Sequence, residues 1–183
     1  FSHNNIIMKI ALIGPGIMNI PPVGWGAVEI LIWDFYNALK QHHEVTIINP
    51  LRQFPSDNLL NTNYTQDLIR SINEGAYDFV HLHYDVHVVI VPYLTCTKIA
   101  ITSHYPFIDD LNKHVSDGYH VIFAQIIKNK DLHIFCLTTK DIEIFIANGA
   151  QKNRCVLLSN GINADLFHFV ALPTRKTICL GKI

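Results

Sequence analysis

A glycine-rich loop near the start of the sequence has residue types that could bind a phosphorylated ligand. Residues 14–26 follow an apolar run and hold four glycines. A dinucleotide-binding loop would need a third glycine where Asn19 stands, and a helix start where Pro21-Pro22 stand. It would also need an acidic residue after the second strand, where the sequence has Asn49-Pro50. We therefore do not expect this loop to bind NAD.

The end of the same loop, Gly24-Trp25-Gly26-Ala27-Val28-Glu29, leads into a helix. Gly26 would let exposed backbone N–H groups approach a ligand phosphate at the positive end of the helix dipole. Alternatively, Gly26 is only the N-cap and Glu29 is a capping carboxylate. Glu29 falls on a largely apolar helix face, so we expect it to be at least partly buried. The sequence leaves both interpretations of Gly26 open.

Polar side chains also follow the predicted strands. Ligands of an open parallel sheet bind beyond the carboxyl ends of its strands. Since side chains alternate along a strand, His81 and His83 face the same side, but only His83 lies near the strand end, so His81 is expected to be a hydrogen-bonded core histidine. His104 precedes Pro106, which favours a side chain that points into a cleft. The strand ends with polar groups are His83-Tyr84-Asp85, Ser103-His104-Tyr105, Thr138-Thr139 and Asn160-Gly161.

The eleven histidines do not form a recognisable metal site. The two tight pairs, His42 with His43 and His81 with His83, have no cysteine or carboxylate at a familiar zinc spacing. We therefore expect no metal and no other cofactor. The four cysteines are widely separated, which favours free thiols in a reducing compartment and hence a cytoplasmic protein.

Composition restricts the class of partner. The chain has 183 residues, 49% hydrophobic and 16% charged, with a net charge of -1. This composition indicates a folded protein with an apolar core and gives no electrostatic reason to expect nucleic acid or an anionic membrane as a partner. The longest uncharged apolar run, residues 86–97, is too short to span a bilayer. Peripheral membrane contact stays possible, but nothing in the sequence supports it.

The elements that must position these residues alternate between short apolar runs and longer helical patterns. This alternation predicts an α/β fold, with a Rossmann-like parallel sheet and helices on both faces. The predicted strands cover residues 9–13, 44–48, 79–83, 98–102, 133–137 and 155–158. The predicted helices cover residues 27–41, 65–74, 115–129 and 138–148, the last with a capping-box start at Thr138 and Asp141 and a terminator at Gly149.

The domain organisation follows from the same pattern. We expect one Rossmann-like domain over residues 8–172. Residues 173–183 are expected to be a linker and the first strand of a second domain that lies beyond this sequence. Residues 1–7 are expected to be a remnant that takes no part in the fold, since a fresh strand begins at Met8-Lys9.

Several segments, taken in order, resemble the retaining nucleotide-sugar-dependent glycosyltransferases of family 4, which have the GT-B fold. The first strand opens with Met-Lys-Ile-Ala-Leu-Ile, and Glu44-Val45-Thr46 resembles the entry to the second strand. Residues 22–29 resemble the Gly-Gly-x-Glu loop of the family and residues 78–83 its D-x-x-H-x-H strand. Residues 102–104 resemble its T-x-H strand end, and residues 157–167 its N-G-[VI]-[DN]…F segment.

The resemblance implies that this chain is the amino-terminal, acceptor-binding half of a GT-B glycosyltransferase. Its substrates would be a nucleotide-sugar donor and a glycan, lipid or small-molecule acceptor. By position in the family motifs, Gly26 and Ala27 would contact the donor phosphates, and His104 would act as the catalytic residue beside the donor sugar. The remaining residues expected around the acceptor and the cleft are Trp25, Glu29, His83, Tyr105 and Asn160.

Two other functions stay open at this point. A sugar-nucleotide epimerase of the same architecture would need acidic side chains at the sugar carbon, and the candidates Asp85, Asp109 and Asp110 do not form an evident set. A non-catalytic domain that binds a sugar or another partner is the third possibility.

Overall fold

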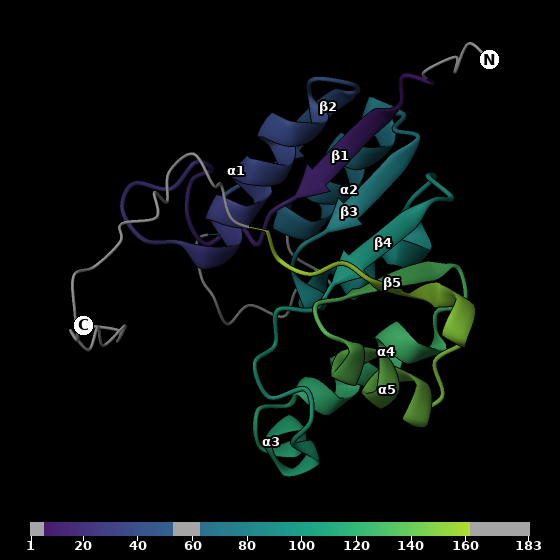
Figure 1. Ribbon diagram of the computed structural model, residues 1–183. Helices are drawn as coiled ribbons and strands as arrows, with labels where there is room; N and C mark the ends of the chain where they lie inside the picture. The colour runs from purple at the N-terminus through teal and green to yellow at the C-terminus, as the bar shows by residue number, and fades with distance from the viewer. Residues whose placement is uncertain (1–5, 53–62, 162–183) are drawn as a thin grey trace, which may run out of the picture.

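The computed structural model of the protein describes residues 6–52 and 63–161. It contains a six-stranded sheet in the order β2-β1-β3-β4-β5-β6, in which all neighbours are parallel (Figure 1). This arrangement confirms the predicted Rossmann-like α/β class. The strands are β1 (Lys9–Ile13), β2 (Glu44–Ile48), β3 (Phe79–Leu82), β4 (Ile99–Thr102), β5 (Leu132–Cys136) and β6 (Cys155–Leu157).

Helices cover both faces of the sheet, as predicted (Figure 1). Side chains alternate along a strand, so β1 contributes Ile10 and Leu12 to one core cluster and Ala11 and Ile13 to the other. The first cluster packs against Ile32 of helix α1 (Ala27–Leu39). The second packs against α2 (Asn63–Gly75), α4 (Tyr119–Lys128), α5 (Thr139–Ala147) and the 3₁₀ helix η2 (Asp85–Tyr93).

Two helical predictions need correction. The predicted helix over residues 115–129 is two helices, α3 (Leu111–Ser116) and α4, because Gly118 between them adopts a left-handed conformation with φ 71°. The apolar run after residue 85 forms η2, which the sequence analysis did not predict as helical. A run that is buried on several sides has no clear helical period, so its pattern gave no signal.

The predicted start of α5 is confirmed. The Thr138 hydroxyl accepts a hydrogen bond from the Asp141 N–H at 3.1 Å, and the Asp141 carboxylate accepts one from the Thr138 N–H at 2.9 Å. This reciprocal pair satisfies two N–H groups that the helix itself cannot satisfy. Gly149 follows the helix with φ 102°, in the left-handed region that favours glycine.

Several expectations lie outside the described residues. The predicted linker and final strand at residues 173–183 and the carboxyl-terminal boundary at residue 172 fall there, as do most of residues 1–7. Within the described ranges, none of the helices has the length and apolar character needed to cross a bilayer.

The side chain of Arg154 caps the carboxyl end of α4, a helix that is distant from it in the sequence. It belongs to the short 3₁₀ turn Lys152–Arg154 and is only 3% exposed. Its guanidinium donates hydrogen bonds to the carbonyls of Ile126, at 3.2 Å, Ile127, at 3.4 Å, and Asn129. These carbonyls lie at the end of α4, where the helix provides no N–H partners.

Replacement of this side chain, Arg154→Ala, is expected to lower the free energy of unfolding by about 2–4 kcal/mol, because several buried carbonyls lose their donors. Urea denaturation measures the change. Lys152→Ala is the control, since it removes an exposed cation from the same turn and is expected to stay within about 0.5 kcal/mol of the parent. Equal stability of the two variants would show that α4 does not need the guanidinium.

Candidate functional site

A cavity of about 530 Å³ lies beyond the carboxyl ends of β1, β3 and β4. Its walls come from the loop after β1, the first turn of α1, the segments that follow β3 and β4, and the start of α4. In an open parallel sheet this edge is where ligands bind. The cavity therefore lies where the sequence analysis expected the site.

Most of the predicted site residues meet at this cavity. Trp25, Ala27, Glu29, His83, His104 and Tyr105 all line it. Gly26 lies between two lining residues as the N-cap of α1. Asn160, by contrast, is exposed and is not one of the lining residues. The structure thus brings together the candidates from the first half of the chain and leaves Asn160 outside the cavity wall.

The start of α1 shows why a small residue occurs at position 26. Gly26 is buried, and a Cβ atom there would lie 3.0 Å from the Cβ of Pro22 and 3.1 Å from Oε2 of Glu29. Its φ of 177° is extended backbone, so close packing rather than backbone conformation accounts for the glycine. Glu29 is 5% exposed, as its position on the helix predicted. Gly26 is the N-cap of α1, without a side-chain capping hydrogen bond, and the next residue, Ala27, lines the cavity. A contact between this helix start and a ligand phosphate stays a prediction.

The first half of the glycine-rich loop is already engaged with the chain itself. The Asn49 side-chain oxygen accepts a hydrogen bond from the Gly16 N–H at 2.8 Å, and its NH₂ group donates to the Met18 carbonyl at 2.7 Å. A Cβ at Gly14 would lie 2.3 Å from the same Asn49 oxygen. Asn49 therefore takes up the Gly16 N–H and fills the space beside Gly14, while the absence of NAD binding stays a prediction.

Of the two histidines at the site, His83 is buried and His104 is half-buried, and the pKa of each is lowered, which favours the neutral imidazole at pH 7. His104 and His83 stack with ring centroids 5.9 Å apart, and His83 is 1% exposed. Burial lowers the pKa of His104 to about 4 and that of His83 well below its usual range. Neither His83 nitrogen nor Nε2 of His104 has a hydrogen-bond partner among the described residues. Neutral imidazoles can donate and accept hydrogen bonds at pH 7, so these groups suit a ligand with hydroxyl groups.

His81 has a different role. Its Nε2 lies 2.7 Å from the Thr102 hydroxyl, and the side chain is 3% exposed. The expectation that His81 is a hydrogen-bonded core histidine is confirmed.

Asp85 lines the cavity, although the sequence analysis named it only as a polar strand-end residue and as an epimerase candidate. Its Oδ2 accepts hydrogen bonds from the Ser103 hydroxyl at 2.9 Å and the Tyr119 hydroxyl at 3.0 Å, while Oδ1 is buried without a partner among the described residues. Burial raises the pKa of this carboxyl to about 7, although the two hydrogen bonds oppose the shift. The sequence feature that pointed to Asp85 was its position just after a predicted strand. Its partners are 18 and 34 residues away, and no local pattern identifies them.

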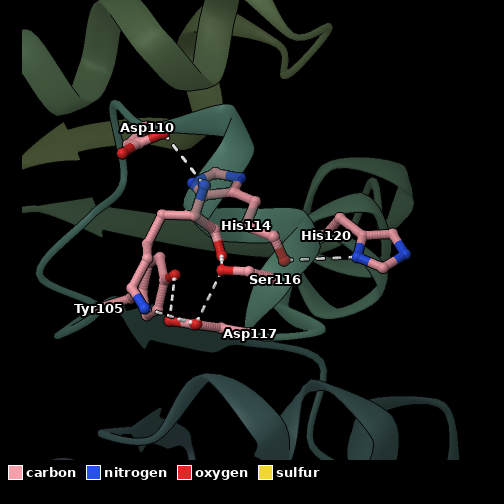
Figure 2. Close-up of polar contacts among 7 residues, drawn as sticks. Tyr105, Asp110, His114, Ser116, Asp117 and His120 are labelled. Carbon is pink, nitrogen blue, oxygen red and sulfur yellow. Dashed lines mark hydrogen bonds and ion pairs between the residues drawn. The ribbon is translucent and has the colours of Figure 1, made fainter.

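The turn between α3 and α4 positions Tyr105, one of the residues that line the cavity, and Figure 2 shows the polar contacts around Asp117 in this turn. The Asp117 carboxylate accepts hydrogen bonds from Tyr105, at 2.9 Å, Lys113, at 2.8 Å, and Ser116, at 3.1 Å. The Tyr105 ring stacks on that of Tyr119, with centroids 3.8 Å apart. These contacts fix the Tyr105 ring against the cavity.

The three acidic residues that the sequence analysis considered for an epimerase do not meet at one place. Asp109 pairs with Lys140, and Asp110 caps α3 by accepting a hydrogen bond from the Lys113 N–H at 3.0 Å. Asp85 alone of the three lines the cavity. Over residues 6–52 and 63–161, no group of three or more histidine, cysteine or acidic side chains could hold a metal ion, and the absence of a metal requirement stays a prediction.

Comparison with known proteins identifies the fold. No family model and no curated protein matches the sequence. Among solved structures, Anabaena HepE in complex with UDP and glucose aligns with a TM-score of 0.57 and 13% identity, over 90% of this chain and 47% of the HepE chain. HepE in complex with UDP-glucose aligns with a TM-score of 0.57 and 14% identity, over the same shares. The chain spans about half the length of the solved structures it matches.

The class of protein defined by the sheet order and this similarity is a Rossmann-like α/β domain that matches one half of a GT-B fold. At 13–14% identity, HepE shares the fold with this chain, and the chemistry must be argued from the site itself.

Proposed function

We propose that this chain is the amino-terminal, acceptor-binding half of a nucleotide-sugar-dependent glycosyltransferase, active as part of a longer protein. The observation that carries the proposal is the cavity at the carboxyl edge of the sheet, where the first turn of α1 meets two neutral histidines. The fold similarity to HepE, which was solved with UDP-glucose, supports a nucleotide-sugar donor.

Each group has a chemical role in this proposal. The backbone N–H groups at the start of α1, next to Ala27, would stabilise the donor diphosphate at the positive end of the helix dipole. His104 would donate a hydrogen bond to the donor sugar as positive charge develops on its anomeric carbon. No residue here needs to act as a strong base, and no metal ion is part of the proposal.

The resemblance to family 4 further suggests transfer with retention of configuration. The bond from the anomeric carbon to the diphosphate oxygen breaks, and a bond to the acceptor hydroxyl oxygen forms on the same face. The acceptor proton passes to the leaving diphosphate, so the step requires no oxidant and no external base. The anomeric configuration of the product, read by NMR coupling constants, tests retention directly. A cytoplasmic location is part of the same proposal.

The test is an assay of UDP release from UDP-glucose by the longer protein that contains this chain, with mixed sugar and lipid acceptors. We expect acceptor-dependent UDP release by the longer protein and none by the 183 residues alone, because one half of the site cannot position both substrates or exclude water. Turnover by the isolated chain would overturn the half-site assignment. If the longer protein binds sugars but releases no nucleotide from any donor, the domain is a binding module.

A further inference from the structure

Three polar groups at one part of the cavity wall have unused hydrogen-bonding capacity. Oδ1 of Asp85, both ring nitrogens of His83 and Nε2 of His104 are buried without partners among the described residues. All three side chains line the cavity, and His83 and Asp85 are 1% and 6% exposed. A buried polar atom without a partner costs free energy. Several such atoms beside one cavity are typical of groups that bind a ligand with donors and acceptors of its own.

The rest of the wall is largely apolar. Trp25, Ile17, Met18, Val28 and Ile122 contribute hydrocarbon or aromatic surface. Trp25 and Ile17 are 66% and 54% exposed, so the wall also offers apolar surface that protein atoms do not cover. A ligand that satisfies both parts combines a hydroxyl-rich group with an apolar group.

The charges near Asp85 disfavour an anion at that part of the wall. Three carboxyl groups line the cavity, those of Glu29, Asp85 and Asp117, and the described lining includes no lysine or arginine. A phosphate or carboxylate beside Asp85, away from the N–H groups at the start of α1, would meet like charge in a poorly hydrated site.

The wall also gives little reason for a cation to bind. The Asp117 carboxylate is already paired with Lys113. The raised pKa of Asp85, about 7, leaves this carboxyl only partly ionised at neutral pH. An uncharged ligand therefore suits the wall best.

We propose that this cavity binds an uncharged glycoside, with a hydroxyl group of the sugar donating to Oδ1 of Asp85, the imidazole of His83 hydrogen-bonded to a second hydroxyl, and an apolar aglycone against Ile17 and Met18 of the loop after β1. As a statement about the acceptor, the inference rests on the proposed function. It adds the chemical class of the acceptor, which is neutral and not phosphorylated or acidic.

The test uses a matched pair of ligands that differ at one carbon. 4-Nitrophenyl β-D-glucoside and 4-nitrophenyl β-D-glucuronide share an aglycone, and only the glucuronide carries a carboxylate. NMR titration of the ¹⁵N-labelled 183-residue chain at pH 7.5 measures both dissociation constants. We expect the glucoside to shift the amides of Ile17, Val86 and Tyr105 in a saturable way, and the glucuronide to bind at least 5-fold more weakly. A ratio below 5, or no saturable shift with either ligand, would overturn the proposal.

A variant tests the role of Asp85 itself. Asp85→Asn keeps the shape but cannot carry charge, so we expect the ratio between the two ligands to fall at least 3-fold. Asp131→Asn is the control, since Asp131 is exposed at the amino end of β5, the opposite edge of the sheet, and should leave the ratio unchanged. An unchanged ratio in a folded Asp85→Asn protein would remove Asp85 from the site. If this variant does not fold, the comparison of the two ligands on the parent chain still decides the proposal.

The result also separates this inference from the proposed function. A neutral preference together with no glycosyl transfer by the longer protein would refute the transferase and keep the ligand class. Transfer to acidic acceptors would keep the transferase and refute the ligand class.

Discussion

Acidification from pH 7 to about pH 4.5 is expected to unfold this protein. Burial lowers the pKa of His81 and of His87 to about 3, that of His104 to about 4 and that of His83 well below its usual range. An unfolded histidine takes up a proton near pH 6.5. Between about pH 6.5 and pH 4, the unfolded chain therefore binds protons that the folded chain cannot accept, and stability falls as the pH falls.

Asp85 opposes this trend. Its pKa is raised to about 7 by burial, so below that pH the folded chain holds a proton that the unfolded chain releases down to about pH 4. By itself this carboxyl would make the protein more stable as the pH falls. Four histidines against one aspartate leave a net uptake of about three protons on unfolding, or ~4 kcal/mol of lost stability per pH unit. A domain stable by about 5–15 kcal/mol cannot tolerate this over two units.

Urea denaturation at half-unit steps from pH 7 to pH 5 measures the slope. His83→Phe is expected to flatten it by about one proton, since the ring borders a cavity and neither of its nitrogens has a described partner to lose. His133→Gln is the matched control, because His133 on β5 is exposed to water before and after unfolding. The slope of the free energy of unfolding against pH gives the number of protons taken up on unfolding. A value below one proton in the parent chain would mean that the buried imidazoles accept protons without unfolding.

His104→Ala is expected to lower turnover of the longer protein by about 10²- to 10³-fold, the size expected for loss of one preorganised donor at a developing charge. The structure indicates that stability will change little, because Nε2 has no described partner that truncation would leave unsatisfied. A stable variant with low kcat would therefore identify a ligand-facing role.

The measurement pairs the melting temperature with kcat on one preparation. His104→Gln is the informative companion, because its amide can place an N–H donor close to the position of Nε2 and should recover part of the rate. Undiminished kcat in a folded His104→Ala protein would take His104 out of the mechanism. The start of α1 would then carry the donor assignment alone.

The strands were predictable because burial on both faces makes each one a short continuous apolar run. β1 and β2 agree with the prediction at both ends, and the other four differ by one residue at one or both ends. The boundary between α3 and α4 was missed because one glycine in a left-handed conformation interrupts a pattern that reads as a single helix. The sequence analysis missed η2 because its buried side chains do not lie on one face of the helix, so the run shows no helical period.

The site was partly predictable for a related reason. Strand ends of a parallel sheet must meet at one edge, so His83 and His104 could be placed together from sequence. Asp85 could not be assigned its partners, because Ser103 and Tyr119 reach it only after β4 and α4 have packed. Asn160 follows a strand end too, but β6 is the last strand of the sheet, away from the cavity between β1, β3 and β4.

The place of β1 between β2 and β3 has a consequence for synthesis of the chain. β1 precedes both of its neighbours along the chain, since β2 and β3, which flank it, end at residues 48 and 82. At typical elongation rates, roughly 4 to 14 s pass between completion of β1 and completion of β3. During that interval Ile10, Leu12 and Ile13, all nearly inaccessible in the folded domain, have no strand on one side to cover them. The nascent chain should thus expose these apolar side chains to chaperones for several seconds, and faster translation of residues 14–82 should shorten that exposure.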